Sequence, residues 1–254
     1  MAAPGALGAR HPDVDRLRRL LRRRSERVAE RAFVLEGPKL LAEALAAGAP
    51  IEAVFVSEDA PPVDFPEARV LRRGVLERVA DTVTPQPVLT VCRAVDVPLA
   101  ALASATFLVV CVDVQDPGNA GTILRSAEAA GAGGVVFAGA SVDPYNPKTV
   151  RASAGSLFHV PIAIDADPLP ALSQRRLGTV AHGGTPLDDA DLRAPVALVL
   201  GNEAHGLPAD APIDEWVTIP MVGRSESLNV GMAAAVLCFE VARQRRGGSE
   251  VVRG

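Results

Sequence analysis

Cysteine and aromatic residues are scarce in this chain of 254 residues. The three cysteines are Cys92, Cys111 and Cys238, and aromatic residues make up 4% of the sequence. The cysteines are widely spaced within apolar runs, without the pairing typical of a metal site or a disulfide framework. We therefore expect reduced core cysteines, no bound metal, and a core built mainly from Ala, Val and Leu.

Long hydrophobic runs are also missing. No apolar segment approaches the ~18 residues that a membrane-spanning helix needs, and the N-terminus lacks the apolar region of a signal peptide. These absences predict a cytoplasmic protein without a membrane partner. With 48% hydrophobic residues, the chain is expected to fold into one large globular domain or two modest ones.

The charges are unevenly distributed. A net charge of −4 would by itself argue against binding to a polyanion. Residues 16–31, however, hold eight arginines, and Leu17, Leu20, Leu21 and Val28 recur among them at helical spacing. This segment is predicted to be one amphipathic helix, whose basic face is either solvated or in contact with nucleic acid.

The order of the patterns predicts two domains. Residues 1–10 are small and turn-rich, so we expect a disordered tail; residues 11–95 are predicted to form a small α/β domain, and 96–105 a linker. In residues 106–254, strand-like runs alternate with helical spacing, which predicts a mostly parallel sheet with helices on both faces. The expected strands span 107–112, 134–138, 160–164, 178–182, 196–200 and 216–219, and the expected helices about 120–131, 147–157, 168–175 and 228–245.

Residues 113–131, DVQDPGNAGTILRSAEAAG, are the most informative segment. They follow a buried-type strand, and loops at the carboxyl ends of such strands commonly bind ligands in α/β proteins. Gly118 and Gly121 allow close approach of a ligand, the helix start favours an anion, and the Arg125 guanidinium is suited to a phosphate. The glycine spacing does not form a dinucleotide fingerprint, so a nicotinamide-dependent oxidoreductase is disfavoured.

Two later segments have the same arrangement of a strand followed by a polar loop. They are LVLGNEAHGLP at 198–208 and IPMVGRSESLNVGMAAAV at 219–236. Taken alone, each indicates a turn, and Ser225 or Ser227 would cap the last helix. Together with residues 113–131, they predict a single site.

The three segments, in this order and at these intervals, resemble the motifs of the SpoU/TrmH family of RNA ribose 2'-O-methyltransferases, within the SPOUT superfamily. The likeness extends over about residues 106–245. One departure is Gly231, where many members have a serine. The residues that carry the resemblance are Asn119, Arg125 and Glu128; Gly201, Asn202, Glu203 and Gly206; Ile219, Pro220 and Met221; and Ser227, Leu228, Asn229 and Val230.

The resemblance implies a fold, a cofactor and an assembly. It implies a C-terminal parallel-sheet SPOUT domain with a trefoil knot, preceded by a small α/β RNA-binding domain, in a homodimer. It also implies S-adenosyl-L-methionine as cofactor, without a metal. The implied cofactor-binding residues are Gly201, Asn202, Ile219, Met221 and Leu228.

The resemblance further implies a catalytic set of Arg125, Asn119, Ser227, Asn229 and Glu203. The family assigns the matching arginine to activation of the ribose hydroxyl. Because a guanidinium with a pKa above ~12 is a poor proton acceptor, we expect Arg125 to hold an RNA phosphate and stabilise negative charge on the oxygen. Asn119, Ser227 and Asn229 are expected to position the ribose or the loops, and Glu203 to orient Arg125 or cap its own loop.

RNA is the implied partner of the N-terminal domain. Ribosomal RNA is favoured over transfer RNA because a separate N-terminal domain is present. The alternatives are transfer RNA as substrate, or a non-catalytic RNA-binding assembly factor that keeps the fold. The expected RNA-binding residues are Arg18, Arg19, Arg22, Arg23, Lys39 and Arg151.

Overall fold

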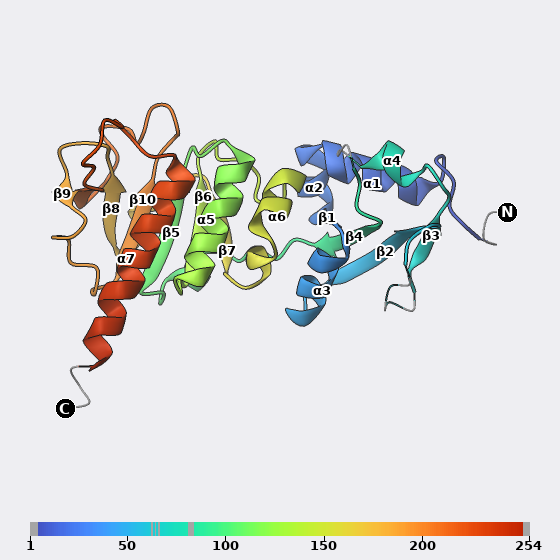
Figure 1. Cartoon of the computed structure of the whole chain (residues 1–254), viewed down its shortest axis with the longest axis horizontal. Helices are drawn as coiled ribbons and strands as arrows, with labels where there is room; N and C mark the ends of the chain where they lie inside the picture. The colour runs from blue at the N-terminus through green and yellow to red at the C-terminus, as the bar shows by residue number, and fades with distance from the viewer. Residues whose placement is uncertain (1–4, 62, 64, 66, 81–83, 251–254) are drawn as a thin grey trace. The chain divides into compact units, whose positions relative to one another are not determined.

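The chain forms two compact units in the computed structural model, which describes residues 5–61, 63, 65, 67–80 and 84–250 (Figure 1). Unit 1 contains the chain up to Val95 together with Tyr145–Phe158, and unit 2 contains Asp96–Pro144 and the chain from His159 onward. Residues 145–158 therefore belong with the N-terminal unit, although the sequence placed them in the second domain.

Unit 1 is built on a four-stranded sheet of order β1-β4-β2-β3. Strand β4 pairs antiparallel with β1 and β2, and β3 pairs parallel with β2. Apolar side chains of α1 and α4 pack on one face of this sheet. In chain order the elements are α1 (Pro12–Arg22), α2 (Arg24–Glu30), β1 (Ala32–Glu36), α3 (Pro38–Ala46), β2 (Ile51–Ser57), β3 (Arg69–Leu71), α4 (Leu76–Val79), β4 (Val88–Arg93), α6 (Pro147–Ser153) and η2 (Ser156–Phe158).

The basic segment forms two helices, so the prediction of one continuous helix was wrong. Arg23 lies between α1 and α2 in an extended conformation, with φ −122° and ψ 117°. The three predicted leucines of α1 are buried, whereas Val28 on α2 is 63% exposed. The guanidinium of Arg27 is buried instead and donates to the carbonyl of Leu20 at 2.8 Å. The break thus gives α2 a different buried face from the one that helical spacing predicted.

The chain before α1 is ordered from residue 5, in contrast to the disordered tail expected for residues 1–10. Leu7 forms a parallel bridge with Leu71, and its amide donates to the Val70 carbonyl at 2.8 Å. The Arg72 amide donates to the Leu7 carbonyl at 3.0 Å. Residues 1–4 of the expected tail lie outside the described residues.

Aromatic and ionic contacts hold residues 145–158 within unit 1. Phe33 on β1 lies against Tyr145 and Phe158, with ring centroids 4.5 and 6.3 Å apart. Arg151 on α6 pairs with Glu36 at the end of β1, at 3.0 Å, and the Glu36 side chain is only 4% exposed. A buried carboxylate needs such a partner to offset its loss of hydration.

Unit 2 is built on a seven-stranded sheet of order β7-β6-β5-β10-β8-β11-β9, in which every pairing is parallel. The predicted parallel sheet is therefore confirmed. Its elements are η1 (Leu99–Leu102), β5 (Phe107–Val112), α5 (Pro117–Ala129), β6 (Gly134–Ala138), β7 (Ile162–Asp165), η3 (Leu169–Ala171), β8 (Arg175–Thr179), β9 (Thr185–Pro186), β10 (Val196–Leu200), β11 (Glu215–Thr218) and α7 (Val230–Glu250).

The two faces of this sheet are covered differently. Helices α5 and α7 lie side by side on one face (Figure 1). The other face packs against the short 3₁₀ helices η1 and η3, through Leu102 and Leu169. Helices therefore cover both faces, as predicted, but those of the second face are short 3₁₀ helices. Residues 96–105, the expected linker, contribute the buried Leu102 to this core.

The prediction of a helix at 168–175 was wrong. Only a 3₁₀ turn forms there, and β8 begins at Arg175. Pro168 directly precedes this turn and Pro170 lies within it. Proline lacks the amide donor that an α-helix requires.

No helix among the described residues is long and apolar enough to cross a membrane.

Candidate active site

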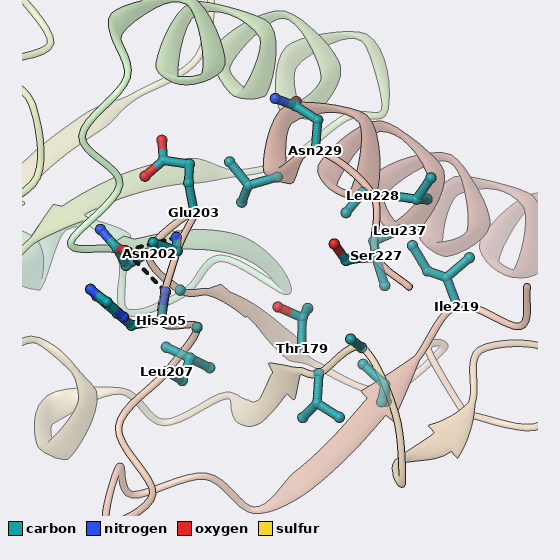
Figure 2. Close-up of a pocket in the computed structure, with 18 of the residues that line it drawn as sticks. Thr179, Asn202, Glu203, His205, Leu207, Ile219, Ser227, Leu228, Asn229 and Leu237 are labelled. Atoms are coloured by element: carbon teal, nitrogen blue, oxygen red, sulfur yellow. Dashed lines mark hydrogen bonds between the residues drawn. The ribbon is translucent and has the colours of Figure 1, made fainter. Parts of the chain in front are cut away.

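A cavity of about 600 Å³ lies at the carboxyl ends of β8, β10 and β11 (Figure 2). These three strands are neighbours in the sheet, so the loops that follow them meet at one edge. Ligands of parallel α/β sheets bind at this edge. The cavity is therefore the candidate site that the strand-and-loop pattern predicted.

The cavity brings together most of the predicted site residues. All five predicted cofactor-binding residues line it, together with three of the predicted catalytic residues. Asn119 and Arg125 are not among the lining residues. The predicted residues that line the cavity are Gly201, Asn202, Ile219, Met221, Leu228, Glu203, Ser227 and Asn229.

Other lining residues were missed by sequence reasoning. Thr179, Val180 and Ala181 at the end of β8, Trp216 on β11 and Leu237 on α7 all line the cavity. The buried-type strand expected at 178–182, followed by glycines, was a signal for the first three. Trp216 and Leu237 carried no such signal, because an apolar residue on a strand or a helix is ordinarily part of the core.

The loop after β10 is a tight turn from Asn202 to Gly206. The Asn202 amide donates to the Gly206 carbonyl at 3.1 Å, and the Gly206 amide donates back at 2.9 Å. The Asn202 Oδ1 accepts from the amides of Ala204 and His205, at 2.9 and 3.2 Å (Figure 2). A Cβ at Gly201 would lie 2.3 Å from the Gly206 carbonyl carbon. The turn can therefore close only because residue 201 is a glycine.

Glu203 in this turn binds the loop that follows β5. Its Oε2 accepts from the Gln115 amide at 3.1 Å, and its Oε1 accepts from the Asp116 amide and from Asn119 Nδ2, both at 3.0 Å. Among the described residues Glu203 makes no hydrogen bond or ion pair with Arg125, so the structure does not bring these two predicted residues together. Its carboxylate instead contacts the loop before α5 and the side chain of Asn119.

The Glu203 carboxylate is set up to remain ionised. Desolvation acts to raise its pKa, but the hydrogen bonds from Asn119, Asp116 and Gln115 outweigh desolvation and lower the pKa below its ordinary value. A carboxylate that is ionised and already accepts three hydrogen bonds is a poor acceptor for a substrate proton. The geometry therefore assigns Glu203 to positioning.

Asn119 and Asn229 connect the remaining loops. Asn229 Nδ2 donates to Asn119 Oδ1 at 2.9 Å. Asn229 Oδ1 accepts from the amides of Gly231 and Met232, at 2.9 and 3.3 Å. Asn229 is therefore the cap of α7, in place of Ser225 or Ser227. Glu203, Asn119 and Asn229 form one continuous chain of hydrogen bonds across the three motif loops.

Gly231 allows α5 and α7 to approach each other closely. A Cβ at this position would lie 3.2 Å from both Thr122 Cβ and Asn229 Oδ1. The serine that many family members have at this position would crowd Thr122 and the helix cap. This contact gives a physical reason for the departure from the family pattern.

Arg125 projects from α5 without a partner in the part of the chain that the structure describes. The neighbouring Ile123 and Leu124 are buried, whereas Arg125 is exposed. It makes no hydrogen bond or ion pair with a described residue. Ser227, in the loop before α7, is likewise exposed and directs its hydroxyl toward the cavity in Figure 2. Both side chains remain available to a substrate.

The predicted RNA-binding residues of unit 1 fall into two groups. Arg18 and Arg19 pair with Asp15, and Arg151 pairs with Glu36. The remaining three are exposed and form no ion pair with a described residue; they are Arg22, Arg23 and Lys39.

Within the described residues, no cluster of His, Cys, Asp or Glu is arranged to hold a metal ion.

Comparison with known proteins identifies the relatives of the chain. Residues 106–239 match the model of the SpoU rRNA methylase family, and residues 11–90 match that of the MRM3-like substrate binding domain. The chain is 33% identical over 232 residues to the 23S rRNA (guanosine(2553)-2'-O)-methyltransferase RlmP of Bacillus subtilis, covering 87% of this chain and 92% of that protein.

Solved structures show the same likeness. An AdoMet-bound rRNA methyltransferase from Sinorhizobium meliloti is 30% identical with a TM-score of 0.81, over 92% of this chain and 95% of its own. The SpoU methyltransferase AviRb from Streptomyces viridochromogenes, in complex with AdoMet, is 28% identical with a TM-score of 0.84, over 93% of this chain and 99% of its own. The chain therefore belongs to the SpoU rRNA methylase family.

Gly201→Ala is expected to destabilise unit 2 by about 1–3 kcal/mol, because the added methyl group forces the Asn202–Gly206 turn open. The matched control is Gly223→Ala, since a Cβ at Gly223 meets nothing within 4 Å. Denaturant unfolding measures the stability, and the emission of Trp216, the only tryptophan of the chain, reports on the cavity. Equal stabilities for the two variants would show that the turn does not depend on this close approach.

Proposed function

We propose that this member of the SpoU rRNA methylase family transfers the methyl group of S-adenosyl-L-methionine to a ribose 2'-hydroxyl in RNA. The observation that carries the proposal is the cavity at the sheet edge, whose lining includes all five residues expected to bind the cofactor. Ribosomal RNA is the favoured substrate, because the names of the RlmP and Sinorhizobium meliloti relatives specify rRNA. Transfer RNA is the alternative substrate.

The cavity has the size and chemistry that this cofactor requires. Its volume of about 600 Å³ falls in the range of small-molecule sites. Ile219, Met221 and Leu228 would supply apolar contacts to the cofactor, and the backbone around Gly201 would supply hydrogen-bonding groups. When bound, the cofactor supplies a methyl group on a cationic sulfonium, which needs no metal for activation.

The chain's own residues then act on the ribose and on the adjacent phosphate. The hydroxyl oxygen bonds to the methyl carbon as the carbon–sulfur bond breaks, sulfur keeps the electron pair, and the hydroxyl proton leaves to solvent or to a phosphate oxygen. Arg125 binds the phosphate and stabilises negative charge on the oxygen. Ser227 and Asn229 position the ribose by hydrogen bonding.

The competing function is a non-catalytic RNA-binding factor that retains the fold. The presence of Arg125, Asn119, Ser227 and Asn229 together argues against it, because a scaffold has little need for all four. The two functions also differ in an observable way, since only the enzyme both binds the cofactor and turns it over.

We include the homodimer and the trefoil knot in this proposal as features that the family resemblance implies. A partly exposed apolar stripe on α7 supports the dimer. Met232, Val236 and Phe239 are 60%, 43% and 48% exposed, and their spacing places them on one helical face. A second copy of the chain would remove this stripe from water.

Methyl transfer tests the proposed function. The full-length protein, labelled S-adenosyl-L-methionine and ribosomal and transfer RNA from cells lacking the protein are expected to give a 2'-O-methylated nucleoside in ribosomal RNA. Arg125→Ala is expected to lose more than about 100-fold in turnover, in the range seen when a group stabilising transition-state charge is removed. Cofactor affinity, read from Trp216 emission, is expected to stay nearly unchanged.

The control for this experiment is Arg193→Ala, another exposed arginine of unit 2, which is expected to behave as wild type. Wild-type protein that binds the cofactor but methylates neither RNA pool, nor ribosomal particles, would favour the scaffold function. Equal losses of turnover and cofactor affinity in Arg125→Ala would overturn its assignment to the RNA side.

The dimer has a separate test. Light scattering is expected to give twice the chain mass of 26.4 kDa for the wild type. The double variant Val236→Glu, Phe239→Glu is expected to give the mass of one chain, because two carboxylates would be buried in each copy of the interface. Ala171→Glu, an exposed position of η3 on the other face of the sheet, serves as the control. A monomeric wild type would rule out the dimer.

A further inference from the structure

A second cavity, of about 300 Å³, adjoins the first at the Asn202–Gly206 turn. The two cavities share residues of this turn as a common wall. His205 lines both cavities, and Figure 2 shows its ring on the far side of the turn from Ser227 and Leu237. The side chains that define the second cavity are Asp113 and Gln115 after β5, Ala140 after β6, and His205, Leu207 and Pro208.

The backbone of this cavity is held in a fixed and locally strained shape. Asp113 has a φ of +56°, a region that residues other than glycine rarely adopt. Its Oδ1 accepts from the Ala140 amide at 2.6 Å, and its carbonyl accepts from Asn202 Nδ2 at 2.9 Å. A Cβ at Gly139 would lie 2.3 Å from Asp113 Oδ1. Strain that is held in this way is concentrated at functional sites.

Gln115 and His205 present unused polar side chains to the cavity. Their backbone amides are fixed, the first by Glu203 at 3.1 Å and the second by Asn202 at 3.2 Å. Both residues are exposed, and neither side chain hydrogen-bonds to a residue that the structure describes. The backbone of each residue is thus fixed, while the primary amide and the imidazole are left available to a ligand.

Apolar side chains form part of the remaining lining, together with the polar Asp113 and Asn202. Ala140, Leu207 and Pro208 form a surface beside the imidazole ring and the amide. A flat apolar surface, an aromatic ring and an amide with both donor and acceptor capacity are the features that bind an unstacked nucleobase in RNA-binding proteins. The ring stacks on the base, and the amide hydrogen-bonds to the edge of the base.

We propose that this second cavity holds one unstacked nucleobase of the substrate RNA, beside the ribose that is methylated. The inference rests on the proposed function, and it adds a site for base recognition to the cofactor cavity. Gln115 lies two residues before Pro117, the first residue of α5, which carries Asn119 and Arg125. A base held here therefore lies on the loop that leads to the expected ribose and phosphate contacts.

Steady-state methylation of ribosomal RNA tests this assignment in the full-length protein. His205→Ala and Gln115→Ala are each expected to raise the KM for RNA by roughly tenfold, a typical loss for one stacked base. His205→Phe is expected to retain most of the RNA affinity, because it keeps a flat ring. Asp210→Ala, an exposed residue of the same connection that lines neither cavity, is the control.

The outcomes separate this site from the proposed function. Wild-type turnover together with a raised KM for RNA in the alanine variants, at unchanged cofactor affinity, supports the base site. Unchanged KM values would overturn the base site while leaving the methyltransferase function intact. His205 also lines the first cavity, so cofactor affinity is judged from Gln115→Ala, which lines only the second. A loss of cofactor affinity in Gln115→Ala would overturn the base site and assign the second cavity to the cofactor.

The ring signals of the histidines give a readout that does not depend on turnover. The chain has four histidines, so the His205 signal is assigned by its loss in His205→Phe. In protein saturated with S-adenosylhomocysteine, unmodified ribosomal RNA fragments are expected to shift this signal. A signal that does not respond to RNA would contradict the assignment.

Discussion

The carboxylate of Glu203 is the interaction on which the site depends. It accepts three hydrogen bonds, from the amides of Gln115 and Asp116 and from the side chain of Asn119. Asn119 in turn accepts from Asn229, which caps α7. Loops that are about 85 to 110 residues apart in sequence are thereby joined through one ionised group. Such a group strengthens each of its bonds, because a charged acceptor binds N–H donors more strongly than a neutral one.

The parallel sheet makes this arrangement possible. Because β5, β10, β8 and β11 are neighbours and run in the same direction, their following loops all lie at one edge. The turn at Asn202–Gly206 then serves both sides of the site. One side faces the proposed cofactor cavity, and the other faces the proposed base cavity, so that a single rigid turn would align the two reaction partners.

The sequence predicted those features that depend on local pattern. Strands 107–112, 134–138 and 196–200 have the predicted bounds, because continuous apolar runs are typical of strands buried on both faces. The helix break at Arg23 and the capping by Asn229 depend on tertiary contacts, which residue spacing does not encode. Trp216 joined the site only through the strand order, in which β8 separates β10 from β11.

We infer that Glu203 organises the site without taking part in the proton transfer. The most direct test compares Glu203→Gln with Glu226→Gln, an exposed control in the loop before α7, by measuring cofactor affinity and methyl transfer together. In Glu203→Gln, the NH2 group of the glutamine side chain would face one of the N–H donors that the carboxylate now binds. Cofactor affinity and methyl transfer are therefore each expected to fall at least about tenfold. Wild-type values of both in Glu203→Gln would contradict the positioning role, and a loss of turnover at unchanged cofactor affinity would instead assign Glu203 to proton transfer.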